Sequence, residues 1–113
     1  MAFVIDASAT LPWRFVDEAT PWTEALLDRV EAGEKILVPA HWPLEVANGL
    51  LVAQRKGRVT DAQVREFIED LAAFSIRVIP AAAEQLPAVL GLAKQYHLTA
   101  YDAAYLELTQ RTG

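Results

Sequence analysis

The sequence contains no cysteine, which excludes disulfide bonds, thiolate metal sites and cysteine nucleophiles. No uncharged apolar run approaches the roughly 18 residues that a membrane-spanning helix needs. The first residues lack the basic start and long apolar stretch of a secretory signal peptide. No segment is biased enough in glycine, serine, proline or one sign of charge to predict a linker or a disordered tail. We therefore expect a soluble, cytoplasmic protein with no membrane partner.

The residues that are present predict one globular domain spanning residues 1–113. Hydrophobic residues make up 53% of the chain, enough to fill a single core. The net charge of -5 repels nucleic acid at long range, so a polyanion would have to bind a local basic patch. The candidate patch is Arg55, Lys56 and Arg58, joined by Arg65. The same cations are also explained as the solvated C-terminal end of a helix, where positive charge is favoured.

Apolar patterns and capping residues predict alternating strands and helices. Strands are expected over residues 2–6, 35–38 and 76–79, where short apolar runs show no polar alternation. Helices are expected from Pro21 to about residue 32, from Pro43 to a stop at Gly57, from a capping box at Thr60, over about 83–96, and from about Thr99 onward. This order is typical of an α/β sandwich with a parallel sheet and helical crossovers.

Three acids are expected at one edge of this sheet. Asp6 follows the first buried strand, while Glu45 and Asp102 fall in the first turns of two helices. Helices that run antiparallel to the strands begin at the strands' carboxyl ends, where ligands of such sheets bind. Helix capping explains Glu45 or Asp102 alone, but it does not explain a carboxylate placed directly after a buried strand.

Carboxylates without histidine or cysteine select hard cations, so the expected cofactor is Mg²⁺ or Mn²⁺. Such an ion lowers the pKa of bound water and neutralises charge on a phosphodiester, which predicts in-line attack by water. The hydroxyls of Ser8 and Thr99 either orient these carboxylates or make local caps. His41 precedes the Glu45 helix and is explained by loop packing or by a place near the site. The tryptophans, with Tyr101 and Tyr105, are interpreted as packing residues or as surfaces that stack on bases.

Three motifs carry a family resemblance: Val4–Ala9, Pro43–Leu50 and Leu98–Leu108. Together they resemble a PIN domain, most closely the VapC toxins of bacterial toxin-antitoxin pairs. The resemblance implies a three-layer α/β/α sandwich. It also implies a Mg²⁺- or Mn²⁺-dependent ribonuclease that cuts structured RNA such as tRNA or rRNA, acts as a homodimer and is silenced by a cognate antitoxin.

The same resemblance assigns Asp6, Glu45 and Asp102 to the family's first three acids. Asn48 and Thr99 match positions that often support those acids, and Glu107 falls where some members carry an accessory acid. Family members continue into a strand that ends in a fourth acid and then into one more strand. This sequence ends at Gly113, so we expect a PIN-like domain that lacks its C-terminal strands. Either the sequence is a fragment, or another chain covers the exposed strand edge in a dimer or larger species.

A second function remains open from the sequence. A PIN module without the fourth acid could dimerise or bind an antitoxin without cutting RNA. A phosphoacceptor receiver domain is disfavoured because the third strand, Ile76 to Ile79, is not followed by an aspartate. A phosphatase with two aspartates one residue apart is disfavoured because Ser8 stands where the second would be.

Overall fold

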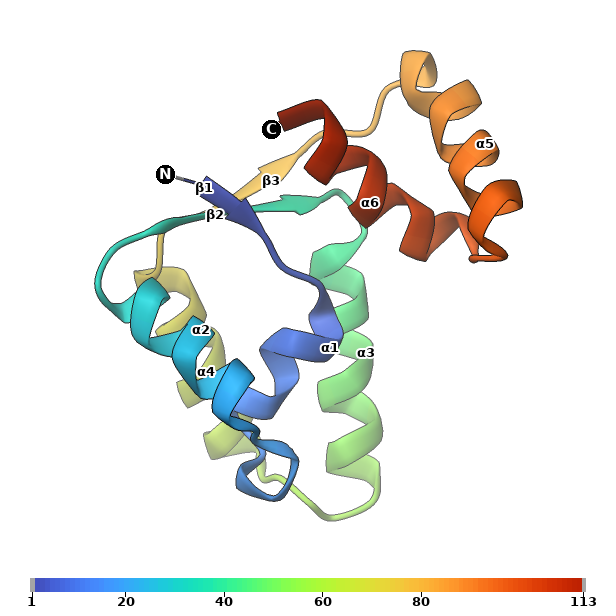
Figure 1. Cartoon of the computed structure of the whole chain (residues 1–113). Coiled ribbons are helices and arrows are strands. Elements are labelled where there is room, and N and C mark those ends of the chain that lie inside the picture. The colour runs from blue at the N-terminus through green and yellow to red at the C-terminus, as the bar shows by residue number, and fades with distance from the viewer. Residues whose placement is uncertain (1, 113) are drawn as a thin grey trace.

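A three-stranded parallel sheet with helices on both faces forms the frame of the molecule (Figure 1). The structure is a computed structural model, and it describes residues 2–112. The strands are β1 (Ala2–Val4), β2 (Lys35–Pro39) and β3 (Ile76–Ile79), in the order β1-β2-β3. The helices are α1 (Ala7–Thr10), α2 (Pro21–Glu31), α3 (Trp42–Arg55), α4 (Asp61–Ala73), α5 (Leu86–Tyr96) and α6 (Ala100–Thr112). Short 3-10 helices cover Leu11–Trp13, Val16–Glu18 and Ala83–Gln85.

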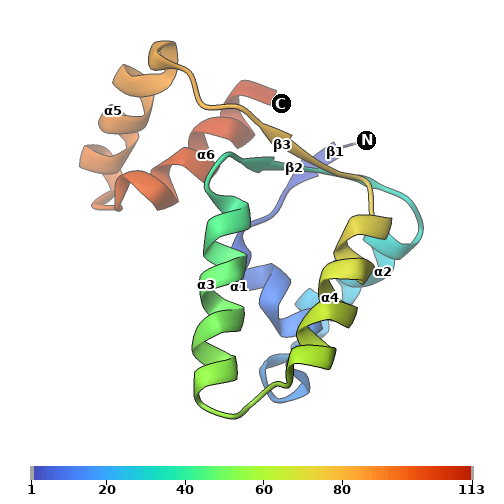
Figure 2. The same cartoon turned by 180° about the vertical axis from the view of Figure 1, so that it is seen from behind.

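The helices divide into two groups about the sheet. Helices α1 to α4 lie on one side, and α5 and α6 lie on the other, as the front and back views agree (Figures 1 and 2). The α/β/α arrangement with a parallel sheet, expected from the sequence, is confirmed. Among the described residues, no helix is both long and apolar enough to cross a membrane.

The centre of the core is strand β2. Ile36 and Val38 are completely buried, and Phe3 of β1 and Ile76 of β3 each pair with Ile36 in register. Val30 of α2 is also almost fully buried, and α6 packs its Leu108 inward. Ile36 and Val38 share one face of β2, and Leu37 on the other face is half-buried, so both faces of this strand are at least partly covered.

Helix boundaries follow the capping residues closely. Thr20 caps α2 with Pro21 at the first helical position, and Thr60 forms a capping box with Gln63 at the start of α4, both as expected. Pro87 falls in the first turn of α5, where the missing backbone donor costs nothing.

Two segments differ from the expectation. The first strand ends at Val4 rather than residue 6, because Asp6 already caps the short helix α1 where a loop was expected. The expected helix over 83–96 begins as a 3-10 turn and becomes α-helical at Leu86. Both differences come from local backbone hydrogen bonds at element ends, which hydrophobic periodicity does not report.

Candidate functional site

Asp6 lies in the connection between β1 and α1, at the carboxyl end of the sheet. Its Oδ1 accepts a hydrogen bond of 2.9 Å from the backbone amide of Ala9 and another of 2.9 Å from the Ser8 hydroxyl. The Thr10 hydroxyl donates to the Asp6 carbonyl at 2.9 Å. Asp6 is thus the N-cap of α1, so the expectation that helix capping does not explain its carboxylate is wrong. Ser8 is one of the groups that orient this carboxylate.

Glu45 lies in the first turn of α3, which begins at the end of β2. Its carboxylate Oε1 accepts a hydrogen bond from the Tyr105 hydroxyl of α6 and lies 3.5 Å from Nε2 of His41. The same His41 nitrogen donates to the backbone carbonyl of Tyr101 at 2.9 Å. His41 therefore connects the start of α3 to the start of α6. It lies beside Glu45, which is the second of the two interpretations of this residue.

Tyr105 is a buried residue of α6 that bonds to Glu45 of α3. Its side chain is buried, and its ring packs edge-on against the His41 ring with centroids 5.0 Å apart. Burial, followed by the hydrogen bond and negative charge of Glu45 and the charge of Asp6, raises the pKa of the phenol; the nearby Ala7 backbone acts in the opposite direction. The phenol is consequently protonated at neutral pH and donates to Glu45.

Asp102 lies in the exposed first turn of α6. Its backbone amide donates to the Thr99 hydroxyl at 3.1 Å, so Thr99 caps this turn. The Asp102 side chain is exposed, and Tyr105 follows it three residues later along the helix. Positions three residues apart share a helix face, so Asp102 lies on the side of α6 that carries Tyr105.

The carboxylate oxygens of Asp6, Glu45 and Asp102 are the type of donor that a hard divalent cation prefers. Within residues 2–112, no group of three or more histidine, aspartate or glutamate side chains lies close enough together to share one ion. Tyr105 is the link between two of these acids, because its hydroxyl donates to Glu45 and it lines the same hollow as Asp6. Mg²⁺ in phosphate-handling proteins is often bound through only one or two carboxylates and several waters, so binding here would not require three converging acids.

The remaining candidate residues are Asn48 of α3 and Glu107 of α6. Asn48 is exposed on α3, three residues after Glu45 and on the same side of the helix. Glu107 is buried, and its carboxylate bonds with Nε of Arg111 at 2.8 Å. Glu107 follows Tyr105 by two residues, which places it on nearly the opposite side of α6. Its charge is therefore engaged by Arg111.

The sequence did not identify Tyr105 as a partner of the acids, because it was interpreted as a packing or base-stacking residue. A usable signal was present: a tyrosine at a buried helical position normally needs a hydrogen-bond partner for its hydroxyl. Glu45 supplies that partner.

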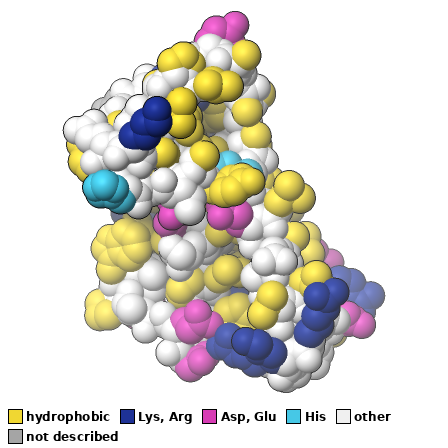
Figure 3. Space-filling model, turned by 90° about the vertical axis from the view of Figure 1, so that its right-hand side faces the viewer, with side chains coloured by type: hydrophobic (Ala, Val, Ile, Leu, Met, Phe, Trp, Pro, Cys, Tyr) yellow, Lys and Arg dark blue, Asp and Glu magenta, His cyan; other side chains and the backbone are white. Residues whose placement is uncertain are grey.

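A hollow of about 220 Å³ opens beside Asp6 and Tyr105. Trp22 and Leu26 of α2 line its other side. Figure 3 shows one face of the molecule with acidic side chains near its middle, close to a histidine and beside a hollowed region. Basic side chains gather at the lower end of this face. A ligand could therefore reach this end of the sheet from solvent.

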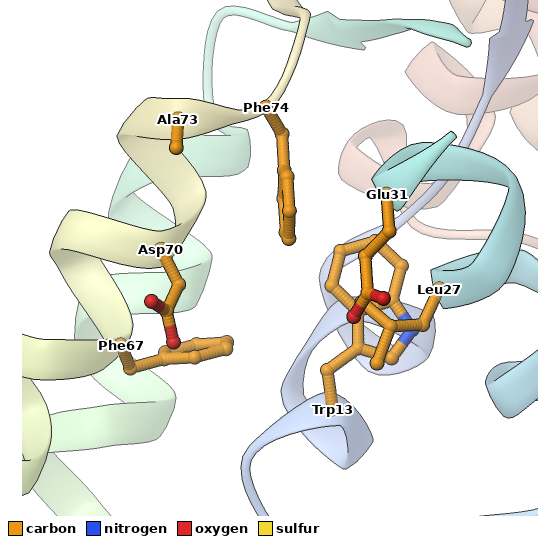
Figure 4. Close-up of a pocket in the computed structure, with 7 residues that line it drawn as sticks. All are labelled: Trp13, Leu27, Glu31, Phe67, Asp70, Ala73 and Phe74. Atoms are coloured by element: carbon orange, nitrogen blue, oxygen red, sulfur yellow. The ribbon is translucent and has the colours of Figure 1, made fainter. Parts of the chain in front are cut away.

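A separate hollow of about 360 Å³ lies between α2 and α4. Its walls carry the aromatic rings of Trp13, Phe67 and Phe74, and the carboxylates of Glu31 and Asp70 stand beside them (Figure 4). None of its lining residues belongs to the Asp6 and Glu45 pair. The aromatic rings make this hollow apolar, and the two carboxylates make it negatively charged.

The basic patch expected from the sequence is divided. Arg58 bonds with Asp17 at 3.0 Å and with Glu18 at 2.8 Å, and its guanidinium lies over the Phe15 ring. These two acids raise the pKa of the Arg58 guanidinium. Arg55 and Lys56 are exposed at the C-terminal end of α3. Arg58 is therefore engaged by the protein's own acids, whereas Arg55, Lys56 and the exposed Arg65 remain candidates for binding phosphate.

Comparison with known proteins gives one informative similarity. No family model matches the chain. Ribonuclease VapC3 of Pyrobaculum aerophilum is 28% identical over 114 aligned residues, which cover 100% of this chain and 85% of that protein. The parallel α/β/α architecture agrees with the same similarity. The resemblance of this chain to the VapC-type PIN ribonucleases is thereby confirmed along its whole length.

Proposed function

We propose that this protein is a divalent-metal-dependent endoribonuclease, the toxin of a toxin-antitoxin pair, that hydrolyses phosphodiester bonds in structured RNA such as tRNA or rRNA. The observation that carries the proposal is that Tyr105 holds Glu45 by a hydrogen bond and lines, together with Asp6, one hollow at the carboxyl end of a parallel sheet. The similarity to a ribonuclease over the full chain supports the reaction class.

Asp6, Glu45 and Asp102 are the proposed acids of the site for Mg²⁺ or Mn²⁺, acting on the ion directly or through bound waters. When bound, such an ion acidifies water and offsets the charge that develops on the phosphodiester. Ser8 and the α1 backbone orient Asp6, while Thr99 fixes the turn that carries Asp102. Asn48 can donate to a phosphate oxygen or a water from its exposed position on α3.

The exposed cations of α3 support RNA as the substrate. Arg55 lies ten residues after Glu45 on one helix, which corresponds to about 15 Å along the helix axis. A strand of RNA held at the acids could therefore bring a neighbouring phosphate to Arg55 and Lys56. This local attraction is needed because the net charge of -5 repels a polyanion.

The proposed partners are a cognate antitoxin and a second copy of the chain, in the cytoplasm. The acid-flanked aromatic hollow between α2 and α4 suits an antitoxin segment that combines basic and apolar side chains (Figure 4). Leu44 and Leu51 of α3, with Leu86 and Leu90 of α5, are exposed and support a homodimer. Light scattering at tens of micromolar measures the mass; we expect a dimer, and a monomer would contradict it.

A non-catalytic PIN module is the second candidate. The observation that favours it is that residues 2–112 place no three acidic or histidine side chains around one point. An assay of RNA cleavage separates the two candidates. We expect the 113-residue chain to cut a folded RNA in Mn²⁺ and to stop in EDTA, whereas no cleavage in Mn²⁺ would favour the module.

A further inference from the structure

Tyr105 contacts Glu45 in a way that leaves part of the carboxylate free. The Tyr105 hydroxyl and the His41 ring nitrogen both approach Oε1 of Glu45. No hydrogen bond or ion pair within residues 2–112 uses Oε2. One oxygen of the carboxylate is thus held by the protein, while the other is available to a cation.

The tyrosine itself is held rigidly. Its side chain is only 9% exposed, its ring packs edge-on against His41, and His41 is in turn bonded to the Tyr101 carbonyl. A donor fixed by packing and by a neighbouring hydrogen bond loses little conformational entropy when it orients an acceptor. Carboxylates that bind metals are commonly oriented by such hydrogen bonds.

We propose that Tyr105 is a positioning residue of the acidic site: its hydroxyl fixes the Glu45 carboxylate through Oε1 so that Oε2 is presented to a divalent cation. This inference rests on the proposed function, because it assigns Tyr105 a role toward the same site. The residue does not touch substrate or ion. It acts through Glu45 and connects α6 to α3.

The alternative role for Tyr105 is a plug, in which the hydroxyl competes with the ion for Glu45. A competing hydroxyl would have to leave before the ion could bind, so its removal would tighten metal binding. A positioning hydroxyl predicts the opposite sign. The two roles are therefore separated by the direction of one affinity change.

The experiment measures Mn²⁺ affinity without RNA, from the relaxation rate of water protons, in the parent chain and in Tyr105→Phe. Phenylalanine keeps the buried ring and removes only the hydroxyl. We expect the dissociation constant to rise about tenfold, in the range typical for loss of a group that orients a metal ligand. Replacement of Tyr105 by 4-aminophenylalanine, which restores a donor at the same ring position, should recover most of the affinity.

Tyr96→Phe is the matched control, since Tyr96 is 52% exposed on α5. It should bind Mn²⁺ as the parent does. An unchanged or tighter dissociation constant in folded Tyr105→Phe overturns the positioning role. If Tyr105→Phe does not fold, the 4-aminophenylalanine variant is the test. This variant keeps a donor at the same ring position, so weakened Mn²⁺ binding by the folded variant would contradict the proposal.

Glu45→Gln separates this inference from the proposed function. If Glu45→Gln leaves Mn²⁺ binding unchanged, the metal site itself is wrong. If Glu45→Gln weakens binding and Tyr105→Phe does not, only the positioning role fails. If both single variants weaken Mn²⁺ binding, adding Tyr105→Phe to Glu45→Gln should weaken it little further. Residues that act through one another have non-additive effects.

Discussion

Asp6→Asn is expected to reduce RNA cleavage by about 100-fold or more, because it removes a charged donor from the proposed metal site. The substitution is nearly isosteric. Asparagine caps helices about as well as aspartate, so the bond from the Ala9 amide that holds α1 can remain. Loss of activity with an unchanged fold would then report the charge alone.

The measurement is the initial rate of cleavage of a folded RNA in Mn²⁺, together with a thermal melt of each variant. Asp28→Asn is the control, since Asp28 is an exposed aspartate of α2. It should cut at the parental rate. The ribonuclease assignment of Asp6 fails if Asp6→Asn cuts as fast as the parent chain and both are equally active in EDTA.

Trp42→Ala is expected to have the largest effect on stability. Trp42 is 7% exposed at the start of α3, and its indole nitrogen donates to the Thr10 hydroxyl at 3.2 Å. Truncation of a buried tryptophan typically costs about 3–5 kcal/mol, from lost burial and the cavity that remains. The total free energy of unfolding of a domain of this size is only about 5–15 kcal/mol. The variant should therefore unfold at a much lower urea concentration than the parent chain, or fail to fold.

Trp22→Ala is the matched control for this prediction. Trp22 is 63% exposed on α2, so its truncation should change the free energy of unfolding by about 0.5 kcal/mol. Urea denaturation of both variants gives the comparison. Equal shifts of the midpoint would show that Trp42 does not anchor α3 on α1.

The hydrogen bond of Trp42 also connects core packing to the site. The Thr10 hydroxyl that receives the indole donor is itself a donor to the Asp6 carbonyl, and Thr10 is fully buried. Residues beneath α1 thus fix the backbone of Asp6. This connection explains why a hydroxyl occupies a fully buried position in a short helix.

Much of the fold could be predicted because local signals and periodicity agree. The proline and threonine caps at Thr20, Pro21 and Thr60 mark helix starts by a mechanism that needs no tertiary structure. The apolar run at Lys35–Pro39 indicates a strand covered on both faces. The short helix α1 was missed because four residues are too few to show a helical period.

The sequence predicts where the candidate acids lie along the elements, but it does not predict the contacts that hold them. Strand ends and helix starts place Asp6 and Glu45 at the same edge, whereas the hydroxyl of Tyr105 reaches Glu45 across 60 residues of sequence. A contact of that separation depends on how α6 packs, which no local pattern encodes. Likewise, the pairing of Glu107 with Arg111 could be read as a helical i, i+4 pair, but the resemblance favoured an accessory acid.

The most direct test of the metal site is a titration of the 113-residue chain with Mn²⁺, followed through its backbone amide resonances. Paramagnetic broadening falls off steeply with distance, so the ion is located by the resonances that it removes first. We expect early losses around Asp6, Glu45 and Asp102. Early losses confined to the exposed acids Glu66, Glu69 and Asp70 of α4, with the first group unaffected, would contradict the assignment of the site.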